Sequence, residues 1–219
     1  MYICSVKKNV IMREDALNQV GNIPFTPSVL LCLFPQRKQI SDKARYLEQD
    51  GRIIRLKRGL YVRSAEDGAM PVPFLIANHL YGPSYVSFQT ALRHYGLIPE
   101  RVYETQSMTI KHNRSFDTPL GRFTYRSCGV DYFPIGIRQE QEGQDTYLIA
   151  SPEKALCDLL LKTAGIAVSS SKKLEAYLAS DLRFEMDALG TFDTKLLEQC
   201  REHAAVKAEQ ITHLISLVR

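Results

Sequence analysis

The chain has 219 residues, of which 45% are hydrophobic and 24% are charged, and its formal net charge is +4. These values are ordinary for a globular protein and leave room for one large domain or two small ones around a buried core. No apolar run approaches the ~20 residues that span a membrane, and the first residues do not read as a signal peptide, so we expect a cytoplasmic protein without a membrane partner.

Apolar residues at helical spacing predict three helices in the first third of the chain. They cover Arg13–Val20, Pro27 to about Pro35, and Gln36 or Gln39 to Asp50. Thr26 is the expected capping residue of the second helix. In the third, Ile40, Ala44 and Leu47 form one apolar face. The opposite face presents Arg37, Lys38, Ser41, Asp42 and Arg45.

The stretch RIIRLKRGLYV, from Arg52 to Val62, follows the third helix and predicts a β-hairpin. Gly59 lets the chain reverse with a positive φ, and Arg58 stands at the tip. Because side chains alternate along a strand, we expect Arg55 and Lys57 to point to one side. The apolar residues on the other side would hold the hairpin against the helices: Ile54, Leu56, Leu60 and Val62.

Positive charge is concentrated in this segment. From Arg37 to Arg63 there are nine Lys or Arg against three acids, so the segment carries +6 and the remainder −2. Helices followed by a basic hairpin are the order of a winged helix-turn-helix, and a confined positive potential is the footprint of a phosphate-backbone partner. The alternative is an ordinary α+β domain whose cations only face solvent. The two basic elements, adjacent and in order, favour DNA binding.

Residues 65–73 are rich in small residues and proline, so they predict a linker between a domain over 1–64 and a second one over 74–219. The second domain predicts helices over Phe74–Tyr81, Phe88–Tyr95 (capped by Ser87), Ser151–Leu161, Lys173–Leu178, Thr194–Glu202 and Ala204–Val218. Strands over Val102–Lys111, Arg122–Arg126, Tyr132–Arg138 and Tyr147–Ala150 would form a small, mainly antiparallel sheet. The predicted fold class is α+β.

No catalytic or metal-binding motif emerges from the sequence. The five cysteines form no Cys-x-x-Cys pair, and we expect Cys32 and Cys157 to be small buried thiols. The histidines show no metal spacing and no glycine loop for phosphate is present. Asp145 with Glu153 could suggest a metal-dependent nuclease, but Asp131, Asp145 and Asp158 are expected to be solvated or capping carboxylates. We therefore expect no enzyme, no cofactor and no metal.

Three blocks of the sequence resemble the AbiEi family of antitoxins, from bacterial type IV toxin–antitoxin systems. They are FTPSVLLCLF through RLKRGLYV, then PSYVSFQTALRHYGLIPE, and finally LIASPEKALCDLL. The resemblance covers roughly Phe25 to Leu161. Its more specific parts are Tyr85 to Leu97 and Ser151 to Asp158. Its motif residues in the second domain are Tyr85, Ser87, Ala91, Leu92, Ser151, Pro152, Glu153 and Asp158, most of which we interpret as caps and core.

The resemblance implies an antitoxin that is also an autorepressor. An N-terminal winged helix would bind inverted repeats in double-stranded promoter DNA, and the C-terminal domain would counter a nucleotidyltransferase-like toxin, with or without stable direct contact. The implied DNA-binding residues are Arg37, Lys38, Ser41 and Arg45 on the third helix and Arg55, Lys57 and Arg58 on the hairpin. Two alternatives stay open. One is a stand-alone regulator whose second domain senses a ligand or dimerises, and the other is the nuclease.

Overall fold

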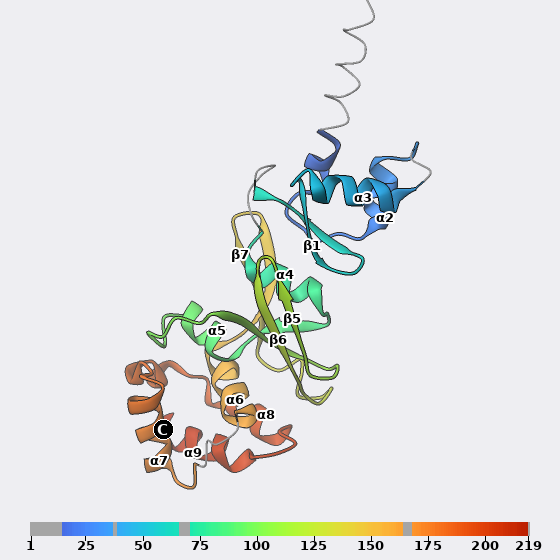
Figure 1. The fold of residues 1–219 in the computed structure, drawn as a ribbon. Helices are drawn as coiled ribbons and strands as arrows, with labels where there is room; N and C mark the ends of the chain where they lie inside the picture. The colour runs from blue at the N-terminus through green and yellow to red at the C-terminus, as the bar shows by residue number, and fades with distance from the viewer. Residues whose placement is uncertain (1–14, 37–38, 66–70, 164–167, 219) are drawn as a thin grey trace, which may run out of the picture.

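The computed structural model describes residues 15–36, 39–65, 71–163 and 168–218. The fold is mixed α+β, as predicted. Figure 1 shows the N-terminal helices at one end of the molecule and the C-terminal helices at the other, with a sheet between them.

The N-terminal unit consists of helices followed by a hairpin, in the predicted order. Its elements are a 3-10 helix η1 (Asp15–Val20), α2 (Pro27–Leu33), α3 (Ile40–Gln49), β1 (Ile53–Lys57) and β2 (Leu60–Arg63). Thr26 stands at the N-cap of α2, but its side chain makes no capping hydrogen bond. Phe25 forms an isolated β-bridge to the hairpin, exchanging backbone hydrogen bonds of 2.7 and 2.9 Å with Tyr61.

The two faces of the hairpin pack in opposite directions. Ile53 and Tyr61 join the core of the N-terminal helices. The other face joins the larger core of the second domain through Leu56, Leu60 and Val62. The prediction that these three residues hold the hairpin against the N-terminal helices is therefore wrong. Alternation along the strands separates two faces correctly, but both are covered, each by a different partner.

The second domain contains a six-stranded sheet in the order β5-β6-β4-β3-β8-β7. The strands are β3 (Ser84–Val86), β4 (Glu104–Thr109), β5 (Arg114–Thr118), β6 (Gly121–Ser127), β7 (Ile137–Glu142) and β8 (Asp145–Ala150). Three neighbouring pairs are antiparallel, and the pairs β3–β8 and β4–β6 are parallel. The sheet is thus mainly antiparallel but mixed.

The predicted strand over Tyr132–Arg138 is wrong in its first part. Residues 130–136 form turns, and the strand begins only at Ile137. Gly136 adopts a φ of +63°, and a Cβ there would come within 3.0 Å of the Cβ of Lys154. The glycine is therefore where the turn passes closely over the helix that carries Lys154.

Helices cover both faces of this sheet. They are α4 (Pro73–Leu80), α5 (Phe88–His94), α6 (Pro152–Lys162), α7 (Ser171–Ala176), the π-helix η3 (Tyr177–Asp181), the 3-10 helix η4 (Met186–Thr191), α8 (Thr194–Glu202) and α9 (Ala208–Val218). Tyr125 donates to the carbonyl of Ala77 on α4, whereas Gln106 on the opposite face accepts from the amide of Gln89 on α5. None of the helices in the described ranges is long and apolar enough to cross a membrane.

Candidate nucleic-acid interface and the buried motif residues

Helix α3 presents part of the predicted interface to solvent. Ala44 and Leu47 bury one side of the helix, and this leaves Ser41 and Arg45 exposed on the other. Asp42 and Glu48 lie three residues to either side of Arg45 and are also exposed, so the potential of this face is mixed. The predicted residues Arg37 and Lys38 lie outside the described residues.

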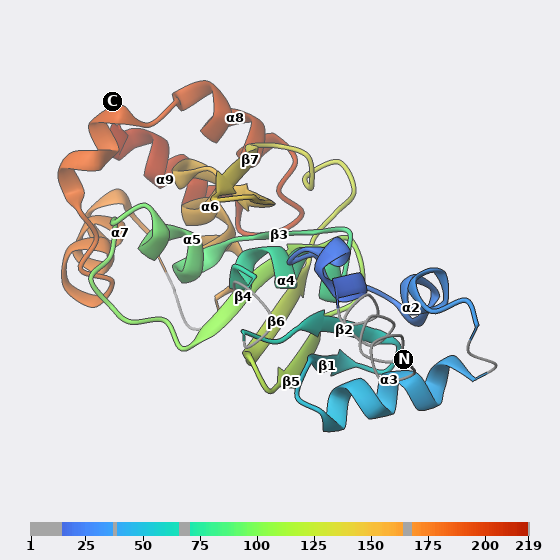
Figure 2. The same cartoon turned by 90° about the horizontal axis from the view of Figure 1, so that it is seen from above.

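The hairpin supplies two further exposed cations. Arg55 pairs with Tyr61 across the two strands and so lies on the face that the N-terminal helices cover, yet its side chain reaches solvent. Arg58 is exposed at the tip beside Gly59, whose φ of +77° allows the reversal. Figure 2 shows α3 and the hairpin side by side at one edge of the molecule. Ser41, Arg45, Arg55 and Arg58 therefore belong to one end of the protein.

Lys57 is directed toward the second domain. Its Nζ donates to the backbone carbonyl of Leu80 at 2.6 Å and stands 5.6 Å from the ring centroid of Phe116. A register irregularity between Arg55 and Lys57 breaks the strict alternation of the strand. The expectation that Arg55 and Lys57 share one face is therefore wrong.

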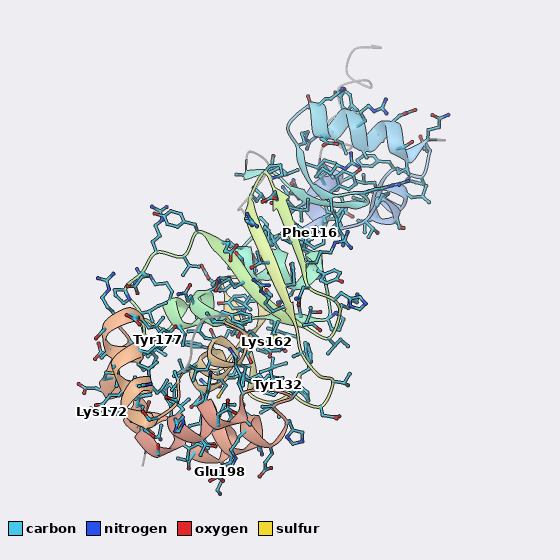
Figure 3. The ribbon with its side chains drawn as sticks, turned by 60° about the horizontal axis from the view of Figure 1, so that its bottom comes forward. Phe116, Tyr132, Lys162, Lys172, Tyr177 and Glu198 are labelled. Atoms are coloured by element: carbon cyan, nitrogen blue, oxygen red, sulfur yellow. The ribbon has the colours of Figure 1, made fainter. Side chains whose placement is uncertain are left out.

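Beside Lys57 lie two cations that the sequence reasoning missed: Arg114, the first residue of β5, and Lys111, in the turn before that strand. Lys111 and Arg114 lie over the ring of Tyr81, and Arg114 also lies over Phe116. Burial, followed by the charges of Arg114 and Lys111, lowers the pKa of Lys57. Figure 3 places Phe116 where the sheet meets the N-terminal unit. We call Lys57, Lys111 and Arg114 the junction cluster.

The junction cluster continues the basic surface of the hairpin. Strand β1 contacts β5, so cations from two separate parts of the sequence meet there. The stretch KHNR over residues 111–114 was the available sequence signal, but it begins at the end of the predicted strand Val102–Lys111 and lies far from the hairpin in sequence. Only the contact between the hairpin and the second domain brings it beside Lys57.

The motif residues of the second domain meet in a buried polar network around Asp158. One carboxylate oxygen of Asp158 accepts the hydroxyls of Tyr85 at 3.0 Å and Ser87 at 2.6 Å, and the other accepts that of Tyr132 at 2.7 Å. Asp158 is fully buried, so the expectation of a solvated carboxylate is wrong. Ser87 stands at the N-cap of α5, but its hydroxyl is used here and makes no capping bond.

Lys154 supplies the counter-charge of this network. Its Nζ lies 3.7 Å from Asp158 one helical turn away, donates to the carbonyl of Tyr132 at 2.9 Å, and stands over the Tyr132 ring. Burial and then the charge of Asp158 raise the pKa of the Tyr85 hydroxyl far above its ordinary value, which keeps it a donor. The network joins β3, the turn before β7 and α6, so these motif residues hold the domain together.

The two carboxylates of the nuclease alternative are occupied by backbone groups. Asp145, which we expected to be solvated or capping, is buried and accepts the amide of Val72, the residue before α4, at 3.0 Å. Glu153 accepts the amide of Asp193 at 3.2 Å. In the part of the chain that the structure describes, no three His, Cys, Asp or Glu side chains gather as metal ligands would.

Comparison with known proteins places this chain by its fold alone. No family model and no curated protein matches it. Among solved structures, it resembles the RV2827C protein from Mycobacterium tuberculosis with a TM-score of 0.52 and 12% sequence identity, over 95% of this chain and 80% of that chain. The likeness thus extends over both the N-terminal unit and the second domain.

Proposed function

We propose that the chain is an antitoxin and transcriptional autorepressor of the AbiEi kind. Its N-terminal unit would act as a winged helix that binds promoter DNA, with α3 in the major groove and the hairpin as the wing. Its second domain would counter a nucleotidyltransferase-like toxin, and both activities would take place in the cytoplasm.

The observation that carries the DNA-binding part is the position of the exposed cations. Arg45 on α3 and Arg55 and Arg58 on the adjacent hairpin reach solvent from one end of the molecule. The helices, the hairpin and the β-bridge of Phe25 support the winged-helix interpretation. Phosphate contacts from such residues position a protein on duplex DNA without reading its sequence. Lys111 and Arg114 would extend the same contact onto the second domain.

The antitoxin part rests on the motifs that resemble the AbiEi family. Tyr85, Ser87 and Asp158 belong to these motifs, and all three are buried in one network. They therefore stabilise the domain and are poorly placed to touch a toxin. Any surface that counters a toxin lies elsewhere on the second domain.

The DNA-binding part is tested with the double variant Arg55→Ala/Arg58→Ala and a duplex carrying the inverted repeats upstream of the gene. Binding is followed by fluorescence anisotropy over a series of salt concentrations. Each phosphate neutralised contributes about −0.9 to the slope of log K against log salt, so we expect the slope to become less negative by about 1.8. Lys172→Ala, which removes one exposed charge from α7 at the far end of the molecule, is the control.

The antitoxin part is tested by co-expressing the neighbouring toxin gene and measuring growth. We expect the wild type and the double variant to relieve toxicity equally, because the changed residues lie in the N-terminal unit. Loss of both DNA binding and neutralisation in a variant with wild-type thermal stability would refute the division of labour. Toxicity that the wild type does not relieve would refute the antitoxin proposal itself.

One observation favours a second function, a regulator that senses a small ligand through its second domain. A cavity lined by Arg126 and Lys162 lies between the sheet and helices α5 and α6. We propose no catalytic role for Asp145 and Glu153, because each carboxylate already accepts a backbone amide.

A further inference from the structure

The cavity beside α5 and α6 has a volume of about 320 Å³. Its floor is one face of strands β4 and β6, whose paired residues alternate onto it: Glu104, Gln106, Thr124 and Arg126. Its walls are Phe88 and Gln89 of α5, the end of α6 with Lys162 and Thr163, and Tyr177. Figure 3 shows Lys162 and Tyr177 where the sheet meets the C-terminal helices.

Two cations from different elements line this cavity. Arg126 belongs to β6, and Lys162 is the last residue of α6. Within the described ranges, neither side chain forms a hydrogen bond or an ion pair. The neighbouring carboxylate of Glu104 is already occupied, since it accepts from Gln106 at 3.1 Å and Thr124 at 3.3 Å and faces Arg122 at 3.6 Å. The cavity therefore offers two positive charges that form no ion pair with the described carboxylates, Glu104 included.

Neutral donors complete the lining. Burial, and then the charge of Asp181, raises the pKa of the Tyr177 hydroxyl, which is therefore a protonated donor at neutral pH. Tyr177 begins the π-helix η3, an irregularity that often occurs at functional sites. Phe88 on the opposite wall has a φ of +56°, an unusual value for a bulky residue. Backbone departures from regular geometry thus occur on two walls of the same cavity.

A larger cavity of about 510 Å³ lies near the turn before β6, but its arginines are already engaged. Arg93 donates to the carbonyl of Ile98, Arg101 lies over the ring of Tyr103, and Arg122 pairs with Glu104 and Asp117. Such arginines hold loops and strands in place. The contrast with Arg126 and Lys162 singles out the smaller cavity.

We propose that the cavity lined by Arg126, Lys162 and Tyr177 binds a small molecule that carries a phosphomonoester. A phosphate group accepts charge-assisted hydrogen bonds from both arginine and lysine, and the cavity is at the lower end of the size range of ligand pockets. It lies on the face of the sheet that α5 and α6 cover. The hairpin contacts the domain through β5 and the end of α4, so this site is separate from the proposed DNA interface.

The test is isothermal titration calorimetry on the full chain at constant ionic strength, with inorganic phosphate, ribose 5-phosphate and 5′-AMP as probes. We expect saturable binding of at least one phosphomonoester, weakened about tenfold or more in Lys162→Ala and in Arg126→Ala, since each removes a charge-assisted contact. Lys162→Arg keeps the charge and should retain most of the affinity. Lys172→Ala, equal in charge change but on exposed α7, should bind as the wild type.

Three results would overturn the proposal. They are no saturable binding of any probe, an equal loss of binding in Lys172→Ala, and loss of duplex DNA binding in Lys162→Ala or Arg126→Ala without binding of any phosphomonoester. The last would assign these cations to a nucleic-acid surface. Thermal melting of each variant shows whether lost binding reflects a change at the site or unfolding of the protein. Failure of promoter binding with intact phosphomonoester binding would count against the DNA-binding function alone.

Discussion

The buried pair of Lys154 and Asp158 makes the sharpest prediction about stability. Both side chains have no exposed area and lie 3.7 Å apart. Removing one partner of such a pair leaves an uncompensated buried charge, which destabilises proteins by about 3–5 kcal/mol. We therefore expect Lys154→Met and Asp158→Asn each to lower the free energy of unfolding by about this amount. For a chain of this size the melting temperature would fall by roughly 6–20 °C.

Thermal and urea unfolding followed by circular dichroism measures the effect. Lys172→Met is the control, since it changes the same residue type at an exposed position, and we expect it to lie within about 0.5 kcal/mol of the wild type. The double variant Lys154→Met/Asp158→Asn should lower the free energy of unfolding by less than the sum of the two single variants, because it leaves no unpaired buried charge. A loss below about 1 kcal/mol in either single variant would refute the argument that the pair holds the domain together.

Two further predictions concern titratable groups. Burial alone would raise the pKa of Glu140, but hydrogen bonds from Tyr95 at 2.7 Å and His94 at 2.8 Å outweigh it and lower the pKa. A carboxyl group whose pKa is lowered in the folded state stabilises the fold at pH values above its ordinary pKa. This stabilisation is lost as the pH falls through the lowered pKa. Tyr95→Phe should therefore lower the free energy of unfolding in urea by about 1 kcal/mol at pH 7 and by less in acid. An equal loss at both pH values would contradict this linkage. Burial raises the pKa of the Cys128 thiol to about 11, so mass spectrometry after alkylation at pH 8 should show exposed Cys32 labelled well before Cys128.

Local chemistry predicted α6 and α8 well because the start of each is determined by an adjacent capping residue, whereas Thr26 and Ser87 make no capping bond at α2 and α5. Ser151 accepts the amide of Lys154 at 3.3 Å, and Pro152 occupies the first turn, so α6 begins where the sequence places it. Thr194–Glu202 was predicted with the observed bounds. Cys32 is the counter-example among side chains. It lies in an apolar run but is exposed, since only part of a short helix faces a core.

The strands were less predictable because whether a segment forms a strand depends on the strands beside it. Strand β3 has only three residues and is buried at the middle of the sheet, so it carries no alternation. Strand β5 is a polar edge strand that pairs only with β6 among the strands of the sheet. Neither pattern distinguishes a strand from a loop until the partner strands are known.

The buried network left a sequence signal that our reasoning did not use. Glu153 and Lys154 are adjacent and therefore point in different directions on a helix. The informative spacing is the one from Lys154 to Asp158, four residues apart within the apolar run ALCDLLL. Opposite charges at that spacing on an otherwise apolar helix indicate a buried pair, because a single charge there would be too costly. Their hydroxyl partners come from distant segments and could be identified only from the fold.

The hairpin links the two halves of the protein more closely than the predicted linker suggests. Leu56, Leu60 and Val62 are buried in the core of the second domain, and Lys57 donates to the carbonyl of Leu80. A fragment ending near residue 64 would expose those three apolar side chains. Each would lose the stabilisation of about 1.5–3 kcal/mol that its burial provides. Lys57→Ala would loosen this joint as well as remove a charge. The DNA-binding and antitoxin roles are therefore best separated in the full chain and through Arg55 and Arg58, whose side chains reach solvent.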